Sequence, residues 1–502
     1  MGIMVIELVA SRVVSKYFGN SLYTWTGIIG VVLGGISLGN YIGGKLADRY
    51  RPRDTIPYLL LTASFFVLVI LLVDFLLEGI LHKSEIFGVT GSMVVKSFLL
   101  IFVLFFVPST CLGTISPVMV KYALEERRRV GNTVGVIYAL ASMGSIFGTF
   151  LSGFLLIPLL GIKTILCLIS FAIASLALLV RRARYLTAAW LIVAAVFSVF
   201  LARGTFDRWS ASHRDDSVQT LYARDSRYSH IKVLQGPYGG RTERVLVMDG
   251  LIHNRYNPED PDDLIYDYEK IYAAVVERWV SLGSARSAFA TLTIGGGACQ
   301  LPAYLGRRYP ASRNEIVEID PEVIHVARRY FDFRPSPRLE ITIADARNYV
   351  NAVTGGKEYD IVFLDAFNSY SVPTHLTTRE FTETLAEILS PDGLVAANVI
   401  DIYYLVRFLA AYLATLREVF AHVAVFPNAG FSPAQRSTFV ILASRVELPL
   451  TFVRNANGSI VTRRLTERAI ADLMDRIDPV PLTDDHAPVE NMIGPVFVRS
   501  VQ

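Results

Sequence analysis

The chain has 502 residues, of which 52% are hydrophobic, and a formal net charge of +3. This near-neutral balance gives no reason to expect a nucleic-acid partner. The three cysteines, Cys111, Cys167 and Cys299, are too few and too scattered for a disulfide framework or a metal site, and we expect no metal.

Long uncharged apolar runs are concentrated in residues 1–202, which predicts a transmembrane helical domain followed by a soluble part. A bilayer span needs about twenty apolar residues. Such runs occur at residues 21–44, 56–77, 94–120, 133–158, 161–180 and 185–202. We expect a seventh span at the N-terminus, where the sequence carries Glu7 and Arg12 and lacks the polar flank and cleavage site of a signal peptide.

Small residues recur every fourth position in two of these runs. They are Gly35, Gly39 and Gly43 in one run, and Gly144, Gly148 and Ser152 in the other. This spacing places them on one face of a helix, where they allow close helix packing.

The soluble part opens with alternating runs such as HIKVLQ and RVLVMDG, separated by GPYGGRTE. This pattern predicts β-hairpins, and we assign residues 217–275 to a small β-hairpin domain. The acidic segment at residues 257–272 leads into a helix that reaches Trp279. The acidic residues of this segment are either exposed to solvent at the start of the helix or border a pocket that binds a cation.

Residues 288–320 combine an apolar run, three glycines, a helix-length segment and a second apolar run that ends in Glu318 and Asp320. Gly295, Gly296 and Gly297 let the backbone turn sharply and approach a ligand closely. A carboxylate about twenty residues further on can bind a ribose diol. This unit therefore predicts an adenosine-binding βαβ motif.

Strands and helices alternate from Thr291 onward, which predicts a doubly wound parallel sheet within residues 276–502. The strands are TLTIG, EIVEID, LEITIAD, YDIVFLDAF, LVAANVI, HVAVF and STFVILAS. The helices begin near Pro321, Ala346, Thr378 and Tyr404. Glycines or acids end four successive strands, at Gly295–Gly297, Glu318 with Asp320, Asp345 and Asp365. Ligands bind at these strand ends, so one shared ligand explains the four groups together.

Several motifs resemble those of the polyamine aminopropyltransferases, such as spermidine synthase, over residues 217–444. They are MDG at 248–250, YEKIY at 268–272, GGG at 295–297, VEID at 317–320, DA at 345–346 and LDAF at 364–367. The whole chain looks like fused forms in which a multispan membrane domain precedes the synthase-like domain, with LTDDHAPVE at 482–490 resembling their C-terminal motif. The resemblance implies a β-hairpin domain plus a Rossmann-like sheet of the class I methyltransferase type.

The resemblance also implies the donor and the roles of individual residues. The donor is decarboxylated S-adenosylmethionine, with intact S-adenosylmethionine as the alternative. By motif match, Glu318 binds the ribose, Asp345 binds the adenine amine, Asp365 deprotonates the attacking amine and Tyr268 helps to hold it. The remaining donor-site residues are Gly295, Gly296, Gly297, Asp320 and Ala346, and the acceptor-site residues are His253, Glu269, Asn368 and Tyr370.

The sequence departs from this family at two acidic positions. Ala298 and Cys299 follow the three glycines, where the family has an aspartate that holds the aminopropyl ammonium of the donor. Asn368 stands in place of a second aspartate after Asp365. The remaining acids, Asp365, Glu269, Asp484, Asp485 and Glu490, can supply cation binding if they converge on the pocket.

Three functions stay open from the sequence. The first is a membrane-bound aminopropyltransferase that acts on an amine or polyamine, and the second is a methyltransferase or other S-adenosylmethionine enzyme. The third is a transporter with a soluble domain that senses a nucleoside or polyamine. The expected partners are a small amine and the lipid bilayer, and a homodimer is an open alternative.

Basic residues predict which loops of the membrane domain face the cytoplasm. They cluster in the loops 45–53, 121–129 and 181–184. A full crossing by residues 185–202 would then place the soluble domain outside the cell, whereas adenosine cofactors are made inside. We give the cofactor more weight and expect an integral protein of the bacterial inner membrane whose soluble domain faces the cytoplasm.

Overall fold

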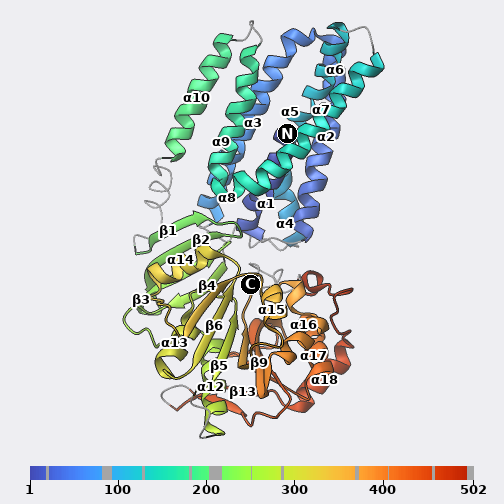
Figure 1. Cartoon of the computed structure of the whole chain (residues 1–502). Coiled ribbons are helices and arrows are strands. Elements are labelled where there is room, and N and C mark those ends of the chain that lie inside the picture. Colours follow the sequence, from blue (N-terminus) through green and yellow to red (C-terminus); the bar gives the residue numbers. More distant parts are fainter. Residues whose placement is uncertain are drawn as a thin grey trace. The chain divides into compact units, whose positions relative to one another are not determined.

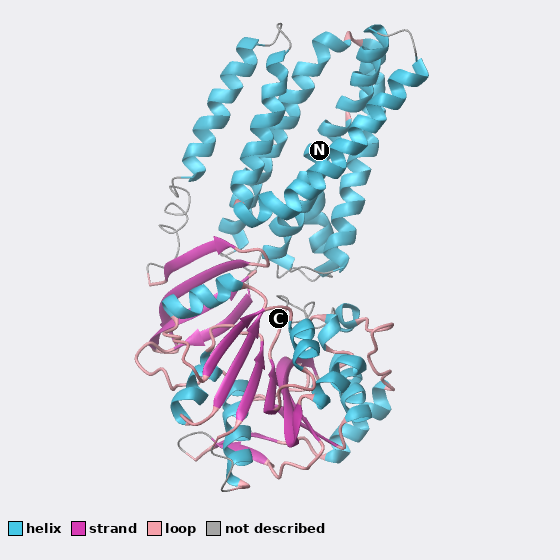
Figure 2. Ribbon diagram, viewed as in Figure 1, coloured by secondary structure: helices cyan, strands magenta, loops and turns pink. Residues whose placement is uncertain are grey.

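The computed structural model describes residues 1–18, 22–81, 93–126, 130–179, 184–202, 217–249, 251–283, 288–367, 372–404, 406–454 and 458–493. The chain divides into a helical unit, Met1–Asp216 with Arg224–Ser229, and an α/β unit, Ser217–Ala223 with His230–Gln502. Figures 1 and 2 show both units, and each is described by itself below.

The described part of the helical unit consists of helices with short connections. The first three are α1 (Gly2–Phe18), α2 (Leu22–Arg49) and α3 (Pro52–Leu81). A fourth stretch runs through α4 (Met93–Ile101), η2 (Phe102–Phe106), α5 (Val107–Gly113) and α6 (Ile115–Glu126). The rest are α7 (Val130–Phe150), η3 (Leu151–Leu156), α8 (Ile157–Leu159), α9 (Ile162–Leu176), η4 (Ala177–Leu179) and α10 (Arg184–Ala202).

Helices occur at all seven places where the sequence predicts a span, and five of them are long and apolar enough to cross a membrane. These five are Leu22–Arg49, Pro52–Asp74, Val95–Glu125, Val130–Leu156 and Ile162–Leu179. Helix α1 has 17 residues, or about 26 Å at 1.5 Å per residue, which is less than the roughly 30 Å thickness of the hydrocarbon core. The described apolar stretch of α10, Arg184–Phe197, is also short.

The first glycine series packs against backbone, as its spacing predicts. A Cβ atom on Gly35 would lie 2.8 Å from the Phe106 carbonyl oxygen, and one on Gly39 or Gly43 would lie even closer to the carbonyl oxygen of Thr110 or Thr114. These glycines therefore let α2 approach α5 and α6 to a distance that no larger residue permits. In the second series, a Cβ on Gly148 would meet the Met1 carbonyl oxygen at 2.8 Å.

A buried ion pair joins α1 and α3. Lys16 Nζ lies 3.2 Å from Asp74 Oδ2, and the Tyr17 hydroxyl donates to Asp74 Oδ1 at 2.8 Å. The Asp74 carboxylate of α3 is therefore paired with a cation and a hydroxyl group of a neighbouring helix.

The α/β unit begins with a four-stranded sheet in the order β1 (Gln219–Asp225), β2 (His230–Tyr238), β3 (Arg241–Met248) and β4 (Leu251–Tyr256). Strand β3 pairs antiparallel with both β2 and β4, which confirms the predicted hairpins. Val233 and Leu246 are fully buried on one face of this sheet. Helix α12 (Asp267–Ser281) follows, as the sequence predicts.

The main sheet contains all seven predicted strands. They are β5 (Ala290–Ile294), β6 (Arg313–Glu318), β7 (Leu339–Ile343), β8 (Tyr359–Leu364), β9 (Leu389–Ile402), β10 (His422–Pro427) and β11 (Arg436–Ser444). Their order is β10-β11-β9-β8-β5-β6-β7. The sheet is mixed rather than wholly parallel, because β11 pairs antiparallel with both β9 and β10.

Helices cover both faces of this sheet (Figure 1), as a doubly wound fold requires. Helices α15 (Ala346–Val353), α16 (Arg379–Glu387) and α17 (Phe408–Val419) share a core with Leu292, Ile294 and Val362. Helices α12 and α13 (Gln300–Arg308) share a core with Ile361 and Phe363 on the other face. Residues that alternate along β8 therefore face different helices.

Three of the four predicted helix starts agree with the structure to within one residue: α14 (Pro321–Tyr330), α15 and α16. Helix α17 instead begins at Phe408, four residues after the expected Tyr404. The reason is that the Asp401 carboxylate accepts the Leu409 backbone N–H at 3.0 Å and so satisfies the first turn there. The sequence did not predict β12 (Phe452–Arg454), β13 (Ile460–Arg463), α18 (Glu467–Ile477) and the short 3-10 helix η6 (Thr374–Leu376).

Candidate active site

The glycine loop between β5 and α13 lies against the end of β8. Gly295 and Gly297 have φ angles of 95° and 47°, a region that glycine adopts without strain. The Gly295 N–H donates to the Val317 carbonyl at 3.0 Å, and the Asp365 N–H donates to the Ile294 carbonyl at 2.9 Å. The loop, the end of β6 and the end of β8 are thereby held together.

Glu318, at the end of β6, and Asp320, which follows it, have different hydrogen-bond partners. Glu318 Oε2 accepts the Gly296 N–H at 2.7 Å, and Glu318 Oε1 accepts the Asp320 N–H at 2.9 Å. Asp320 is 2% exposed, and its carboxylate caps α14 by accepting the Glu322 N–H. Burial raises the pKa of Glu318, although hydrogen bonds from the backbone oppose this shift. Glu318 therefore borders the glycine loop, whereas Asp320 has a capping role that needs no ligand.

Asp345 also begins a helix. Its Oδ1 accepts the Asn348 N–H at 3.0 Å as the N-cap of α15, and its Oδ2 lies 3.1 Å from His375 Nε2. Ala346 is 8% exposed and packs into the core beneath α15. The side chain of Asp345 is 28% exposed, so it keeps a solvent-accessible edge beside η6.

Asp365 follows β8 and is held from two sides. Asn398 Nδ2, from β9, donates to Asp365 Oδ1 at 2.8 Å, and the Tyr268 side chain, from α12, also hydrogen-bonds to Asp365. Burial raises the pKa of Asp365 to about 6, while these two hydrogen bonds partly oppose the shift. The carboxylate is therefore ionised at neutral pH and more basic than an exposed aspartate.

A second buried group lies beside Asp365. Glu269 is 2% exposed, and its Oε1 accepts a hydrogen bond from Asn254 Nδ2, in β4, at 3.2 Å. Burial, followed by the charge of Asp365, raises the pKa of Glu269 to about 8. His253, also in β4, is neutral because burial lowers its pKa to about 4. Tyr268 is likewise neutral, since burial raises its pKa well above the usual value.

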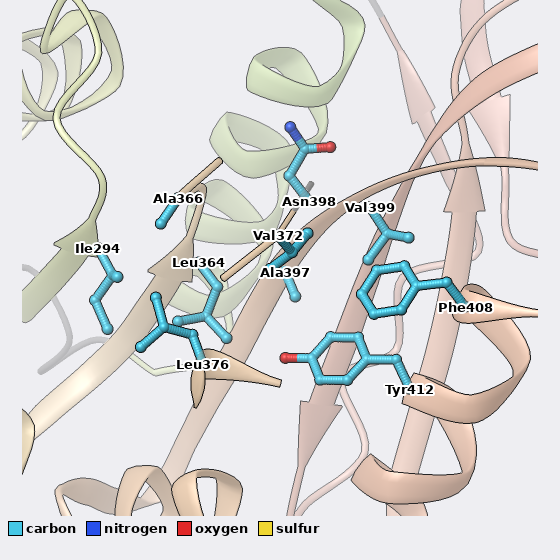
Figure 3. Close-up of a pocket in the computed structure, with 10 residues that line it drawn as sticks. All are labelled: Ile294, Leu364, Ala366, Val372, Leu376, Ala397, Asn398, Val399, Phe408 and Tyr412. Atoms are coloured by element: carbon cyan, nitrogen blue, oxygen red, sulfur yellow. The ribbon is translucent and has the colours of Figure 1, made fainter. Parts of the chain in front are cut away.

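A small apolar pocket lies at the ends of β5, β8 and β9 (Figure 3). Its walls are Ile294, Leu364, Ala366, Val372, Leu376, Ala397, Asn398, Val399, Phe408 and Tyr412. Figure 3 shows the Tyr412 hydroxyl pointing into the pocket and the Asn398 amide pointing away from it. Leu376 follows His375, the partner of Asp345, and Ala366 follows Asp365. The pocket is therefore lined by sequence neighbours of Asp365 and of His375.

The structure brings together some of the predicted site residues. Gly295–Gly297, Glu318 and Asp365 meet at adjoining strand ends, and Tyr268 and Glu269 reach Asp365 from α12. Asn368 and Tyr370 lie outside the described residues. Asp484 binds Arg347 through two contacts of 2.7 and 2.6 Å, so its charge is already paired.

Ala298 lies where the resemblance implies an aspartate, and the structure surrounds it with apolar side chains. It is 2% exposed and belongs to a cluster with Ile231, Val233 and Leu246 of the hairpin sheet and Val323 of α14. Cys299 is fully buried and has a φ of 56° at the start of α13. Ala298 and Cys299 therefore contribute apolar packing to this part of the loop, and neither supplies a carboxylate for a donor ammonium group.

Sequence reasoning missed two amides of this site, Asn254 and Asn398. Both are buried and hydrogen-bond to a carboxylate. The only available signal was a polar residue in an apolar strand, as in LVAANVI, where Asn398 interrupts the buried face of β9. Strand pairing then places Asn398 beside Asp365, since Leu364 pairs with Ala397.

Comparison with known proteins shows which family this part of the chain is similar to. A family described as the spermine/spermidine synthase domain matches residues 269–434. This part of the chain is therefore similar to spermine/spermidine synthase domains. The polyamine aminopropyltransferase of Vibrio vulnificus is 38% identical over 159 residues, which cover 32% of this chain and 51% of that protein. The chain thus matches about half of the length of that relative.

Two further comparisons extend over more of the domain. The polyamine aminopropyltransferase of Nitrosomonas europaea is 27% identical over 266 residues, which cover 51% of this chain and 74% of that protein. A probable spermidine synthase from Corynebacterium glutamicum has a crystal structure that aligns with a TM-score of 0.45 and 23% identity, over 54% of this chain and 97% of that one.

We expect replacement of Glu318 by alanine to weaken binding of an adenosyl donor by at least ~1.5 kcal/mol, about tenfold. The carboxylate has lone pairs left after it accepts the two backbone N–H groups, and a ribose diol can donate to them. Isothermal titration calorimetry with the full chain in detergent measures the loss. Unchanged affinity in a variant that unfolds at the same temperature as the parent would contradict the ribose assignment.

Proposed function

We propose that the chain is a membrane-bound transferase that moves an aminopropyl group from decarboxylated S-adenosylmethionine to an amine or polyamine. The observation that carries this proposal is Asp365, a buried carboxylate held by Asn398 and Tyr268 beside the glycine loop. A sulfonium donor already has a good leaving group, so the protein needs only to align a neutral amine and accept its proton.

The described residues have separate roles in donor binding, proton transfer and positioning of the base. Gly295–Gly297 and Glu318 hold the ribose end of the donor, and the apolar pocket beside Ala366 and Leu376 takes the base. Asp365 accepts a proton from the amine, the amine nitrogen forms a bond to the carbon attached to sulfur, and that carbon–sulfur bond breaks. The thioether leaves with the bonding electron pair, and the aminopropyl group stays on the amine. Asn398 and Tyr268 keep the Asp365 carboxylate in place through this step.

A second candidate is a methyltransferase that uses intact S-adenosylmethionine, and the environment of Ala298 favours it. This position has apolar neighbours and no carboxylate for the donor ammonium. The test compares the two donors with the full chain in detergent, by calorimetry and by release of the thioether product in the presence of diamines. Tighter binding of the decarboxylated donor and amine-dependent thioether release are the expected results. Transfer of a methyl group from the intact donor would replace our proposal with the second candidate.

We propose that the α/β unit faces the cytoplasm, because its donor is made there. Five apolar helices have the length and composition to anchor the chain in a membrane. Reporter fusions after Arg203 and after Gln502 test the orientation, and we expect both reporters to remain inside the cell. Export of both reporters would refute the placement.

A further inference from the structure

The C-terminal segment 482–490, which the proposed reaction does not use, is tied to α15 and α16. Arg347 Nη1 and Nη2 donate to Asp484 Oδ1 and Oδ2 at 2.7 and 2.6 Å, in the bidentate arrangement that fixes both partners. These hydrogen bonds from Arg347 lower the pKa of Asp484, so the pair is ionised at neutral pH. The Asp484 N–H also donates to Glu380 Oε2 at 3.0 Å. Asp484 is therefore held by both its side chain and its backbone.

The same arginine reaches the acid at the end of β7 through one intermediate residue. Arg347 Nη1 also donates to the His375 carbonyl at 3.2 Å. His375 Nε2 lies 3.1 Å from Asp345 Oδ2, and the ring donates there because a carboxylate accepts. Asp345 Oδ1 accepts the Asn348 N–H at 3.0 Å. A continuous chain of hydrogen bonds thus runs from Asp484 to Asp345, and each oxygen of Asp345 keeps a lone pair for a further donor.

This chain of hydrogen bonds ends beside the pocket that is proposed to take the base of the donor. Leu376, which follows His375 in η6, lines that pocket. The Asp345 side chain is 28% exposed and can accept a hydrogen bond from a ligand. An acceptor at the edge of an apolar pocket suits the amino group of a purine base, since that group donates. Arg347 lies in the first turn of α15, which Asp345 caps, so it joins this helix to η6.

We propose that Asp484 and Arg347 are positioning residues for the donor, which hold His375 against Asp345 and so favour a base that carries an amino group. This inference rests on the proposed function and on the expected role of Asp345, and it gives the C-terminal segment a role. The effect passes through His375, so neither residue needs to contact the donor. Without the bidentate pair, η6 and the imidazole are less restrained, and binding of the amino group must then order them.

The test is calorimetric titration of the full chain in detergent with 5′-methylthioadenosine, the thioether that the proposed reaction releases, and with the analogue in which hydrogen replaces the 6-amino group. The parent should bind the amino compound about tenfold more tightly or better, the value of a hydrogen bond to a charged group. Asp484→Asn should bind it about fivefold more weakly, while its affinity for the analogue stays within about twofold of the parent. Arg347→Lys should behave in the same way, because lysine keeps the charge but lacks the planar fork.

The matched control is Glu467→Gln, which breaks another ion pair between an exposed carboxylate and an arginine, Arg464, at 2.7 Å. It should match the parent with both compounds. A selective loss of affinity for the amino compound distinguishes positioning of Asp345 from a purely structural contact, which would weaken both compounds equally. If Asp484→Asn does not unfold at the parental temperature, Arg347→Lys decides in its place.

Parental affinity of Asp484→Asn and Arg347→Lys for the amino compound would overturn the inference, and so would an equal loss for both compounds. If the parent does not distinguish the two compounds, the expected role of Asp345 fails and this inference fails with it. Amine-dependent thioether release by the parent would then still leave the proposed function intact. If the parent releases no thioether from the decarboxylated donor with any amine, the proposed function itself fails.

Discussion

Replacement of Asp365 by asparagine is expected to lower aminopropyl transfer by about 10²-fold or more while donor affinity stays nearly unchanged. An amine is protonated at neutral pH and must lose a proton before its nitrogen can attack. Asparagine has almost the same shape as aspartate but cannot accept that proton. Donor binding should persist because the contact of this residue with the glycine loop is made by its backbone, through the Asp365 N–H and the Ile294 carbonyl.

The measurement is release of the thioether product with a panel of diamines and polyamines. Burial raises the pKa of Asp365 to about 6, so the kcat/KM of the parent should fall as the pH drops below about 6, where the base becomes protonated. The exposed change Asp472→Asn serves as the control and should keep parental turnover. Full activity of Asp365→Asn with every acceptor of the parent would refute the mechanism.

Replacement of Gly295 by alanine should impair donor binding and transfer together, each by 10²-fold or more. Gly295 has a φ of 95°, and a Cβ there would lie 2.8 Å from the Asp365 carbonyl carbon and closer still to its oxygen. A left-handed conformation alone costs an L-residue about 1–2 kcal/mol, and backbone cannot move aside as a flexible side chain can. We therefore expect the alanine to displace both the loop and Asp365, the proposed base.

Calorimetry with the donor and the thioether assay measure the two losses. Gly306→Ala is the matched control, because a Cβ at that position in α13 meets no atom within 4 Å and alanine favours a helix. Donor affinity of Gly295→Ala within twofold of the parent would show that the loop tolerates a side chain. The proposed contact between loop and donor would then be wrong.

Local patterns were sufficient to predict most of the α/β unit. Apolar runs predicted all seven strands of the main sheet, because a buried strand needs a continuous apolar sequence. The antiparallel direction of β11 could not be predicted in this way, since a buried strand has the same composition in either direction. The strands β12 and β13 were missed because each has only three or four residues.

The sequence by itself determined the glycine loop and the carboxylates at the strand ends, among them the proposed base Asp365, because a sharp turn and a strand end are local features. Only the tertiary structure decided the hydrogen-bond partners, the burial and the pKa values of those groups. Asn254 and Asn398 reach Glu269 and Asp365 from distant strands, and the hairpin sheet packs Ala298 into an apolar cluster. Burial then raises the pKa values of Asp365 and Glu269 to about 6 and about 8. Desolvation depends on all the atoms packed around a group, and residues far apart in the chain supply most of those atoms.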